Sequence, residues 1–467
     1  MEETEKVGGF GRGGRGGSRF DRDWTKGSVI ANLWSLGWPM LATQSLQQVG
    51  PFVDMIWVAR LGVASIAGMG VASLVVRLSV GFKVGLVTGM RAIVARFVGT
   101  KDTEGANHVA QQAFVISAVF SIIMAAIGIF LTEPILILFG LEADVVAQGA
   151  AYMRILFVGG AAMSFRTMAE GVMQASGDAI TPMRISIFYK LFHVVLAPFL
   201  IFGWWLFPRL GISGAALTDV VAQSLGLALM FWFLFSGRTR LRLTLRNFRL
   251  DGNIIWRILK IGLPASVVQM ETQLYHIVLM RIIVPFGTLA VAARSLFLRI
   301  QIPLLVAPTS TLGKAGGILA AQNLGAGQPE RAERTGWLAA GFTETLVLII
   351  CLVLLLWAER IIGIFTSEPG VVEIASTWLR IATVGFLALG LSQVLGNCIS
   401  DSGDTVPRIF LDLIGMWVIG VPLAYFVPRV TNLGVYGVQW GIVIGQIARA
   451  VAHITYFKLG RWKRKRV

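Results

Sequence analysis

The triplet Ser176-Gly177-Asp178 recurs as Ser402-Gly403-Asp404, 226 residues further along the chain. Other segments match at nearly the same separation: Gly37-Trp38-Pro39 with Gly262-Leu263-Pro264, Gly62 with Gly287, Gly99 with Gly325, and Gly211, Gly214 and Gln223 with Gly434, Gly437 and Gln446. The separation changes by no more than three residues across the whole set. We therefore infer an internal duplication, and duplicated sets of helices are a common architecture of membrane transporters.

The composition indicates a membrane protein with many spans. Of the 467 residues, 55% are hydrophobic and 14% are charged, and the mean hydropathy is +0.72. The apolar runs are long enough to cross a hydrocarbon core of about 30 Å, which takes roughly 20 helical residues. We therefore predict an all-α polytopic membrane protein. Cys351 and Cys398 lie in apolar runs and suggest neither a disulfide nor a metal site.

The net charge of +16 is unevenly distributed. Arginines crowd residues 238–249 and basic residues crowd 461–466, whereas acids gather in the connections around 133–144 and 359–373. An excess of Lys and Arg on one set of loops is what the positive-inside rule predicts for cytoplasmic loops. We therefore attribute the charge to membrane topology and predict no binding of nucleic acid.

The apolar runs predict twelve transmembrane helices in two pseudo-symmetric six-helix bundles. The expected spans are 28–59, 64–92, 108–132, 146–172, 182–203, 212–236, 254–284, 288–320, 331–357, 371–399, 406–427 and 434–458. The expected domains are a basic tail (1–27), an N-terminal bundle (28–236), a basic linker (237–253), a C-terminal bundle (254–458) and a second basic tail (459–467). An even number of spans places both basic termini on one side, which we predict to be cytoplasmic.

Two bundles of six spans enter the membrane in the same direction, so the pseudo-two-fold axis of the pair runs along the membrane normal. Such a pair can enclose a central cavity and rock to expose it to one side at a time. A channel is the alternative, but the sequence shows no repeated carbonyl-donating loops and no ring of charge. We therefore expect a transporter in the inner (cell) membrane.

Four sets of segments, taken in order, resemble the multidrug and toxic compound extrusion (MATE) family. They are Val53-Asp54 through Gly62; Ala95 through Ala106 with Gln322 through Ala332; Ser176 through Pro182 with Ser402 through Pro407; and Gly211 through Ala216 with Gly434 through Val438. Each segment is weak alone, but the ordered set extends over nearly the whole chain. The wider superfamily also contains lipid-linked saccharide flippases.

The resemblance implies secondary active export, in which a substrate leaves the cell as protons or sodium ions enter. Such a carrier is not an enzyme and needs no cofactor, and the sequence contains no Gly-x-x-x-x-Gly-Lys-Ser/Thr motif for ATP. We expect a monomer in the bilayer that exchanges amphipathic organic cations for protons. Sodium coupling and a flippase for a lipid-linked anionic precursor stay open as alternatives.

Asp54 is the first candidate for ion coupling. A charge near the bilayer midplane costs roughly 2.5–3.5 kcal/mol on insertion scales, so its presence needs a reason. Asp54 shares a helix face with Gln47, Gln44 lies one turn earlier, and Pro51 removes the donor that would bond the Gln47 carbonyl. The resemblance implies an ion-coupling role for this Asp. The alternative is a carboxylate that reaches the outer membrane boundary.

His193 and Asp219 mark a departure from the family. Many members have Asn-x-x-x-Asp-Pro in the fifth span, whereas this chain has His193 followed by Ala197-Pro198. We predict that Asp219 of the sixth span replaces the missing acid, and that His193 bonds Asp219 or Asp54 as a proton relay. The alternative is that Asp219 only neutralises Lys190, which shares the face of His193.

Glu271 is the candidate acid of the second half, with Tyr275 one turn further on. Some family members pair such an acid with another in the tenth span to bind sodium, but here that span offers Ser392 and no acid. A hard cation prefers several oxygen ligands, so protons are favoured and no metal site is predicted. Alternatively, Glu271 pairs with Arg281 or His276 in helix packing.

The expected substrate contacts are polar, methionine and aromatic residues near the acids: Met40, Gln44, Gln47, Met173, Tyr189, Lys190 and Tyr275. Polarisable Met side chains suit promiscuous recognition, and plain helix packing is the alternative. Pro39 and Pro51 are the predicted hinges, about which protonation of Asp54 would bend the first helix. Basic residues within spans challenge the expectation of cationic cargo: Arg77, Lys83, Lys190, Arg281 and Lys314. If several of them face the cavity, we expect a cargo that is anionic or carries an anionic head group.

Overall fold

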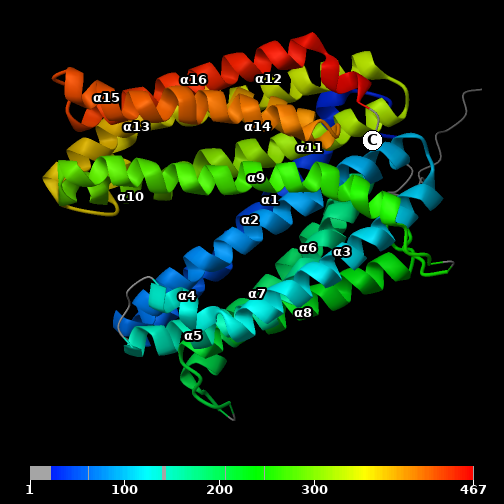
Figure 1. Cartoon of the computed structure of the whole chain (residues 1–467), viewed down its shortest axis with the longest axis horizontal. Helices are drawn as coiled ribbons and strands as arrows, with labels where there is room; N and C mark the ends of the chain where they lie inside the picture. The colour runs from blue at the N-terminus through cyan, green and yellow to red at the C-terminus, as the bar shows by residue number, and fades with distance from the viewer. Residues whose placement is uncertain (1–22, 62, 139–142, 206, 247, 466–467) are drawn as a thin grey trace, which may run out of the picture.

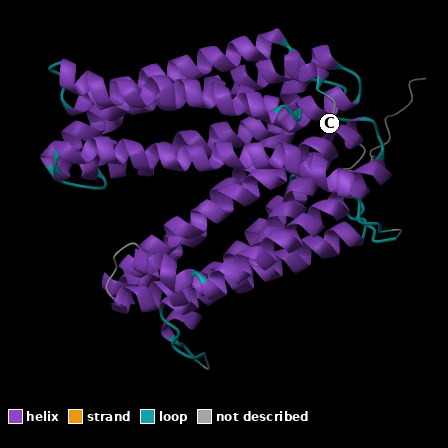
Figure 2. Ribbon diagram, viewed as in Figure 1, coloured by secondary structure: helices purple, strands orange, loops and turns teal. Residues whose placement is uncertain are grey.

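The computed structural model describes residues 23–61, 63–138, 143–205, 207–246 and 248–465, and these residues form helices and loops with no strand (Figures 1 and 2). The helices form two lobes that diverge from a common end (Figure 1). We call α1–α8 the N-lobe and α9–α16 the C-lobe. The all-α prediction is therefore confirmed.

The helices of the N-lobe are α1 (Val29–Val58), α2 (Val63–Gly99), α3 (Thr103–Phe130), α4 (Thr132–Leu138), α5 (Ala143–Val158), α6 (Gly160–Ser176), α7 (Ile180–Phe202) and α8 (Ile212–Phe235). The short 3-10 turn η1 (Ala59–Leu61) follows α1. Ser28 caps α1 and Asp102 caps α3, because each side chain accepts a backbone N–H of the first turn. Residues 236–246 and 248–251 carry no helix.

The helices of the C-lobe are α9 (Gly252–Ile283), α10 (Thr288–Gln301), α11 (Ala307–Gly325), α12 (Pro329–Gly363), α13 (Pro369–Asp401), α14 (Thr405–Leu413), α15 (Val421–Val430) and α16 (Val435–Leu459). The π-helical turns η3 (Ile302–Val306) and η4 (Ile414–Gly420) join α10 to α11 and α14 to α15. The 3-10 turns η2 (Val284–Phe286) and η5 (Arg461–Arg464) follow α9 and α16.

Twelve spans in two bundles account for these helices, with three spans built from more than one segment. The fourth span is α5 and α6, bent by 45° at Gly159, and the eighth and eleventh spans contain the π-helical turns. Within the described residues, eight helices are long and apolar enough to cross a membrane, or nine if the bent pair is one span. The remaining spans, α1, α9 and α16, carry more polar and charged residues, which suits helices that face a polar interior.

The lobes approach each other most closely at the end of the molecule that carries the C-terminus (Figure 1). Gly89 of α2 lies so close to the Ile258 carbonyl of α9 that a Cβ atom would clash with it. Gly325 of α11 lies equally close to the Arg96 carbonyl of α2. Glycine at these two positions lets helix backbones of different lobes touch. We call this region the closed end, and the opposite region the open end.

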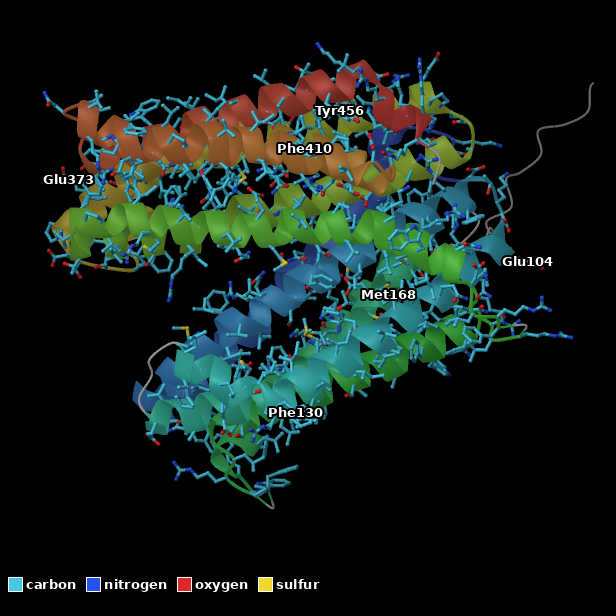
Figure 3. The ribbon with its side chains drawn as sticks, viewed as in Figure 1. Glu104, Phe130, Met168, Glu373, Phe410 and Tyr456 are labelled. Atoms are coloured by element: carbon cyan, nitrogen blue, oxygen red, sulfur yellow. The ribbon has the colours of Figure 1, made fainter. Side chains whose placement is uncertain are left out.

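Large apolar side chains cover the outer faces of both lobes. Phe130 of α3 is 74% exposed and Phe410 of α14 is 60% exposed, and both lie on the outside of the helices (Figure 3). Met168 of α6 is buried in the N-lobe. Apolar residues on the outside suit contact with lipid, so the protein is embedded in a membrane.

Candidate transport cavity and ion-coupling site

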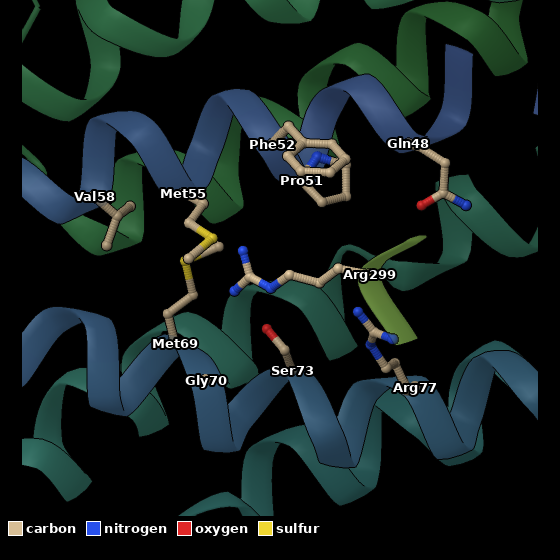
Figure 4. A pocket seen from close by; sticks show the side chains of 10 residues that line it. All are labelled: Gln48, Pro51, Phe52, Met55, Val58, Met69, Gly70, Ser73, Arg77 and Arg299. Atoms are coloured by element: carbon tan, nitrogen blue, oxygen red, sulfur yellow. The ribbon is translucent and has the colours of Figure 1, made fainter. Parts of the chain in front are cut away.

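Three cavities follow one another along the inner side of the N-lobe. The outer cavity, about 340 Å³, lies between α1 and α2 and is crossed by Arg299 of α10 (Figure 4). The middle cavity, about 250 Å³, shares with it Pro51, Met69, Ser73 and Arg77. The deep cavity, about 270 Å³, shares with the middle one Gln47, Val80, Met163 and Arg166. Adjacent cavities therefore have common walls and form a path into the molecule.

The ring of His193 on α7 lies between two carboxylates that line the middle cavity. Its Nε2 atom is 3.0 Å from Oδ1 of Asp54 on α1, and its Nδ1 atom is 3.7 Å from Oδ1 of Asp219 on α8. The side chain of His193 is fully buried, whereas that of Asp219 is 27% exposed. An imidazole can take a proton at one nitrogen and release one from the other. The three side chains therefore offer a proton path that starts at an accessible acid.

Lys190, one turn before His193 on α7, is the second cationic neighbour of Asp219. Its Nζ atom is 3.9 Å from the same Oδ1 atom. Residues three apart share a helix face, so both side chains reach Asp219 together. Gly50 of α1 makes room for the ammonium, because a Cβ atom there would lie 2.8 Å from Nζ. Asp219 is thus close to His193, as a proton relay requires, and close to Lys190, as charge neutralisation requires. The contacts alone are compatible with both alternatives.

A second polar network lines the middle and deep cavities, and the sequence analysis missed it. Arg166 on α6 donates from Nη1 to Oε2 of Glu170 at 2.9 Å and from Nε to Oε1 of Gln223. Gln174 and Gln47 also donate to Glu170, at 3.0 and 3.4 Å. The sequence does contain a signal for this network: Arg166 and Glu170 are four residues apart within the predicted span 146–172. Charged residues inside a span are costly and therefore indicate a polar interior.

Four of the expected substrate contacts line cavities. Met40, Gln44 and Gln47 line the deep cavity, and Gln47 and Lys190 line the middle one. Pro51 lines the outer and middle cavities. Helix α1 nevertheless runs without interruption through both Pro39 and Pro51.

The other three expected contacts lie in helix packing in this conformation. Met173 and Tyr189 are fully buried in the core of the N-lobe, and Tyr275 is buried in the core of the C-lobe. Tyr189 packs beneath cations, with the guanidinium carbon of Arg166 5.0 Å from the ring centroid and Nζ of Lys190 at 5.4 Å. An aromatic face stabilises such cations, so Tyr189 supports the cavity wall from behind.

Glu271 on α9 contacts η4 of the same lobe. The indole Nε1 of Trp417 donates to Oε1 of Glu271 at 2.5 Å, while Oε2 is buried and has no hydrogen-bond partner in the described part of the chain. Neither Arg281 nor His276, the partners considered from the sequence, forms an ion pair with it among the described residues. Glu271 therefore lies apart from Asp54 and Asp219, in the other lobe.

The C-lobe holds a buried charge cluster that the sequence analysis also missed. Asp412 on α14 accepts a hydrogen bond from Nε of Arg449 on α16 at 2.6 Å, and Arg408 and His453 lie 3.6 and 3.4 Å from its carboxylate. The Asp412 side chain is 1% exposed. None of the three cavities reaches these residues. The sequence signal for this cluster is the pair Arg408 and Asp412, two opposite charges four residues apart within a predicted span.

A buried ion pair joins the two lobes at the floor of the deep cavity. Nη2 and Nε of Arg91 on α2 donate to Oδ1 of Asp401 on α13 at 2.6 and 3.1 Å. Their side chains are 5% and 0% exposed, and Arg91 lines the deep cavity. The Gln322 side chain of α11 also donates to the Ala175 carbonyl of α6 at 2.7 Å. These bonds cross from one lobe to the other and hold the closed end together.

No group of three or more His, Cys, Asp or Glu side chains in the described ranges is arranged to hold a metal ion.

Two repeated lobes of six spans, apolar on the outside, joined at one end and lined by ionisable groups within, define a polytopic membrane transporter. The MatE family model matches residues 39–199 and 264–426, one stretch in each lobe and together more than half of the chain. The chain therefore belongs to the MATE family of transporters, as the sequence motifs predict.

Similar proteins agree with this assignment. The probable multidrug resistance protein YoeA of Bacillus subtilis is 25% identical over 92% of this chain and 93% of its own length. The probable multidrug resistance protein NorM of Thermotoga maritima is 21% identical over 94% of each chain. A multidrug resistance MATE family transporter solved in an outward-facing conformation shares the fold, with a TM-score of 0.86 and 24% identity over 94% of this chain and 96% of its own.

Proposed function

We propose that the chain is a secondary antiporter that exports small amphipathic organic compounds in exchange for protons, by rocking of the N-lobe against the C-lobe. The observation that carries this proposal is the His193 ring between Asp54 and Asp219 beside the middle cavity. Relatives named as multidrug resistance proteins support export of organic compounds.

Proton uptake changes the contacts between helices of the N-lobe. Asp54, His193 and Asp219 lie on α1, α7 and α8, so a proton bound among them alters three helix interfaces at once. A ligand shifts a conformational equilibrium only by its difference in affinity for the two states. Carboxylates that attract His193 and Lys190 in one state and are neutral in the other provide that difference.

The proposed orientation follows from the basic residues. The arginine-rich residues 238–246 and 248–249 and the end of α16 lie at the closed end (Figure 1). By the positive-inside rule this end faces the cytoplasm, so the conformation described is open to the outside. We propose a monomer in the inner membrane with both termini cytoplasmic, acting without a cofactor and not as an enzyme.

Two alternatives remain distinct candidates. Sodium coupling is less favoured, because an imidazole stands between the two N-lobe carboxylates and occupies the space that oxygen ligands of a cation need. A flippase for a lipid-linked anionic precursor is favoured by Arg77 and Arg299 in the outer cavity. A cationic cargo, expected from the family resemblance, is not supported by the deep cavity, whose wall carries Lys83, Arg91, Arg166 and Lys314.

Transport in proteoliposomes tests this proposal. Purified protein is reconstituted, and movement of rhodamine 6G, a cationic dye, and of sulforhodamine B, an anionic dye on the same xanthene body, is followed by fluorescence. The pH gradient and the sodium gradient are imposed separately, with protein-free liposomes as the blank. We expect the pH gradient to drive dye movement and the sodium gradient to have no effect.

Asp54→Asn and Asp219→Asn are expected to abolish gradient-driven movement while the protein stays folded. Asp144→Asn is the matched control, because Asp144 is exposed on α5 and touches none of the three cavities. Dye movement driven by neither gradient removes the antiporter claim, and full transport by Asp219→Asn removes the relay through Asp219.

A further inference from the structure

Two lysines face the deep cavity from different lobes. Lys83 comes from α2 and Lys314 from α11, and both line the same space of about 270 Å³. Lys83 is 4% exposed and Lys314 is half-buried. Their placement in a cavity wall, in the middle of membrane-spanning helices, is energetically costly for an ammonium group and therefore asks for a compensating anion.

Neither ammonium has an ion-pair partner in the part of the chain that the structure describes. The acids nearby already have cationic neighbours: Glu170 accepts from Arg166 at 2.9 Å, Asp401 accepts from Arg91 at 2.6 Å, and Asp219 lies 3.9 Å from Nζ of Lys190. The lining of the deep cavity therefore holds four cationic side chains and one carboxylate. The charges of Lys83 and Lys314 are therefore not compensated by a bonded acid, and the deep cavity has an excess of positive charge.

The same excess continues toward the open end. Arg77 of α2 and Arg299 of α10 line the outer cavity, again one from each lobe and again without an ion-pair partner among the described residues (Figure 4). Cavities lined by one sign of charge raise the local concentration of ligands of the opposite sign. An anion entering from the open end thus meets Arg299 and Arg77 before it reaches Lys83.

The rest of the deep cavity is apolar or neutral. Met40 of α1 and Val80, Val84 and Val87 of α2 supply apolar wall, and Gln44 and Thr311 supply neutral hydrogen-bonding groups. Such a wall accepts an apolar body, whereas the two ammonium groups accept a charged head. A cation placed there would lie among like charges with no free carboxylate to bind it.

We propose that the deep cavity binds amphipathic anions, compounds with a carboxylate, sulfonate or phosphate head on an apolar body, and that the head lies between Lys83 and Lys314. This inference rests on the proposed export function and specifies its substrate class. Because the two lysines belong to different lobes, one anion contacts both lobes at once. The bound anion compensates the charge of two ammonium groups and so lowers the cost of burying them.

Binding without any gradient tests the inference separately from transport. Full-length protein in lipid nanodiscs is titrated with sulforhodamine B and with rhodamine 6G, and fluorescence anisotropy gives the two dissociation constants. We expect tighter binding of sulforhodamine B. Lys83→Gln and Lys314→Gln are each expected to weaken its binding at least about tenfold, or about 1.4 kcal/mol, with little change for rhodamine 6G. Lys458→Gln, at an exposed site on α16, is the matched control.

Lys83→Arg and Lys314→Arg retain the charge and should bind sulforhodamine B within a few-fold of the wild type, so a loss through misfolding is told apart from a loss of charge. Tighter binding of rhodamine 6G by the wild type, or unchanged sulforhodamine B binding by both Gln variants, overturns the inference. Selective anion binding without gradient-driven transport leaves the anion site standing and counts against the antiporter instead.

The anion can come from solution or from the membrane. A second arm reconstitutes the protein with fluorescently labelled phosphatidylglycerol and measures its movement between leaflets by dithionite quenching. Movement that Lys83→Gln abolishes supports the anion site and assigns the cargo to lipid. No lipid movement, together with sulforhodamine B transport, supports the anion site and assigns the cargo to soluble compounds.

Discussion

The two lobes share a fold but place their buried acids in opposite surroundings. In the N-lobe, Asp219 is 27% exposed to a cavity, and its cationic neighbours His193 and Lys190 stand 3.7 and 3.9 Å away. In the C-lobe, Asp412 is 1% exposed, and Arg449 donates to it at 2.6 Å. The first carboxylate is open to a cavity, whereas the second is enclosed by fixed cations and closed off from the three cavities.

The contrast teaches that duplication preserved the helices and let the charges diverge. Positions related by the repeat do not carry the same side chains, since Glu170 corresponds to Gly396 and Asp412 to Ser186 at the separation of 226 residues. We therefore propose that ion coupling belongs to the N-lobe and that the buried charge cluster around Asp412 has a structural role.

Removal of the Asp412 carboxylate is expected to have the largest effect on stability. Asp412→Ala leaves Arg449 and Arg408 with uncompensated buried charge, and loss of one partner of a buried pair costs about 3–5 kcal/mol. Thermal unfolding in detergent should show a large decrease in Tm, whereas Asp219→Ala should change Tm little. A stable Asp412→Ala protein that has lost only transport would move the coupling site into the C-lobe.

Replacement of His193 is expected to affect transport and not folding. His193→Asn removes the group that can pass a proton between Asp54 and Asp219, and proton relays of this kind contribute on the order of 10²-fold to rates. The rate of dye export should fall by about that factor, and its dependence on external pH should change. His108→Asn is the matched control, because His108 pairs with Asp251 at 3.3 Å at a partly exposed site outside the cavities. Equal pH profiles in the two variants would contradict the relay.

A smaller effect is expected at Glu271. Glu271→Gln keeps the size of the side chain but weakens the hydrogen bond from Trp417, and hydrogen bonds to charged groups contribute about 1.5–3 kcal/mol. We expect reduced thermal stability and an unchanged pH profile of export. A shifted pH profile would show that the C-lobe acid also takes part in coupling.

The smallest expected effect is a pH-dependent change in Tm at Asp178, which we compare with Asp404 in the other copy of the triplet. Burial raises the pKa of Asp178, whose Oδ1 accepts the Thr181 N–H, whereas Asp404 bonds Tyr456 and Lys465. Since the folded state holds the proton of Asp178 more tightly than the unfolded chain, the stabilisation is present at low pH and is lost as pH rises through the folded pKa. Relative to Asp178→Asn, the wild type should lose Tm as the pH rises above about 4, the ordinary pKa of an aspartate. A constant difference across that range would contradict the assignment.

The sequence was sufficient for the fold and for part of the site. Apolar runs predict the spans because lipid requires every backbone group to bond within a helix, and the spacing of Ser176 and Ser402 predicts the duplication. Asp54, His193 and Asp219 could be singled out because charges inside spans are rare.

The remaining contacts depend on which helix faces which, and local spacing does not contain that information. Arg91 and Asp401 are 310 residues apart and meet only because the lobes close against each other. Met173 and Tyr189 have the right chemistry for substrate contacts but lie on packed faces in this conformation. Lys83 and Lys314 could be noted as basic residues inside spans, but only the fold shows that they share one cavity.

The bond between Arg91 and Asp401 has a consequence for the transport cycle. Its guanidinium belongs to the floor of the deep cavity, and its carboxylate belongs to the opposing lobe. An anion that reaches the floor of the deep cavity competes with Asp401 for the guanidinium of Arg91. Binding of the anion therefore weakens the ion pair between the lobes, and an intact ion pair weakens binding of the anion by the same factor. Under the proposed export cycle, release of the cargo at the open end therefore strengthens the bond between Arg91 and Asp401, and reopening of the closed end is left to the proton.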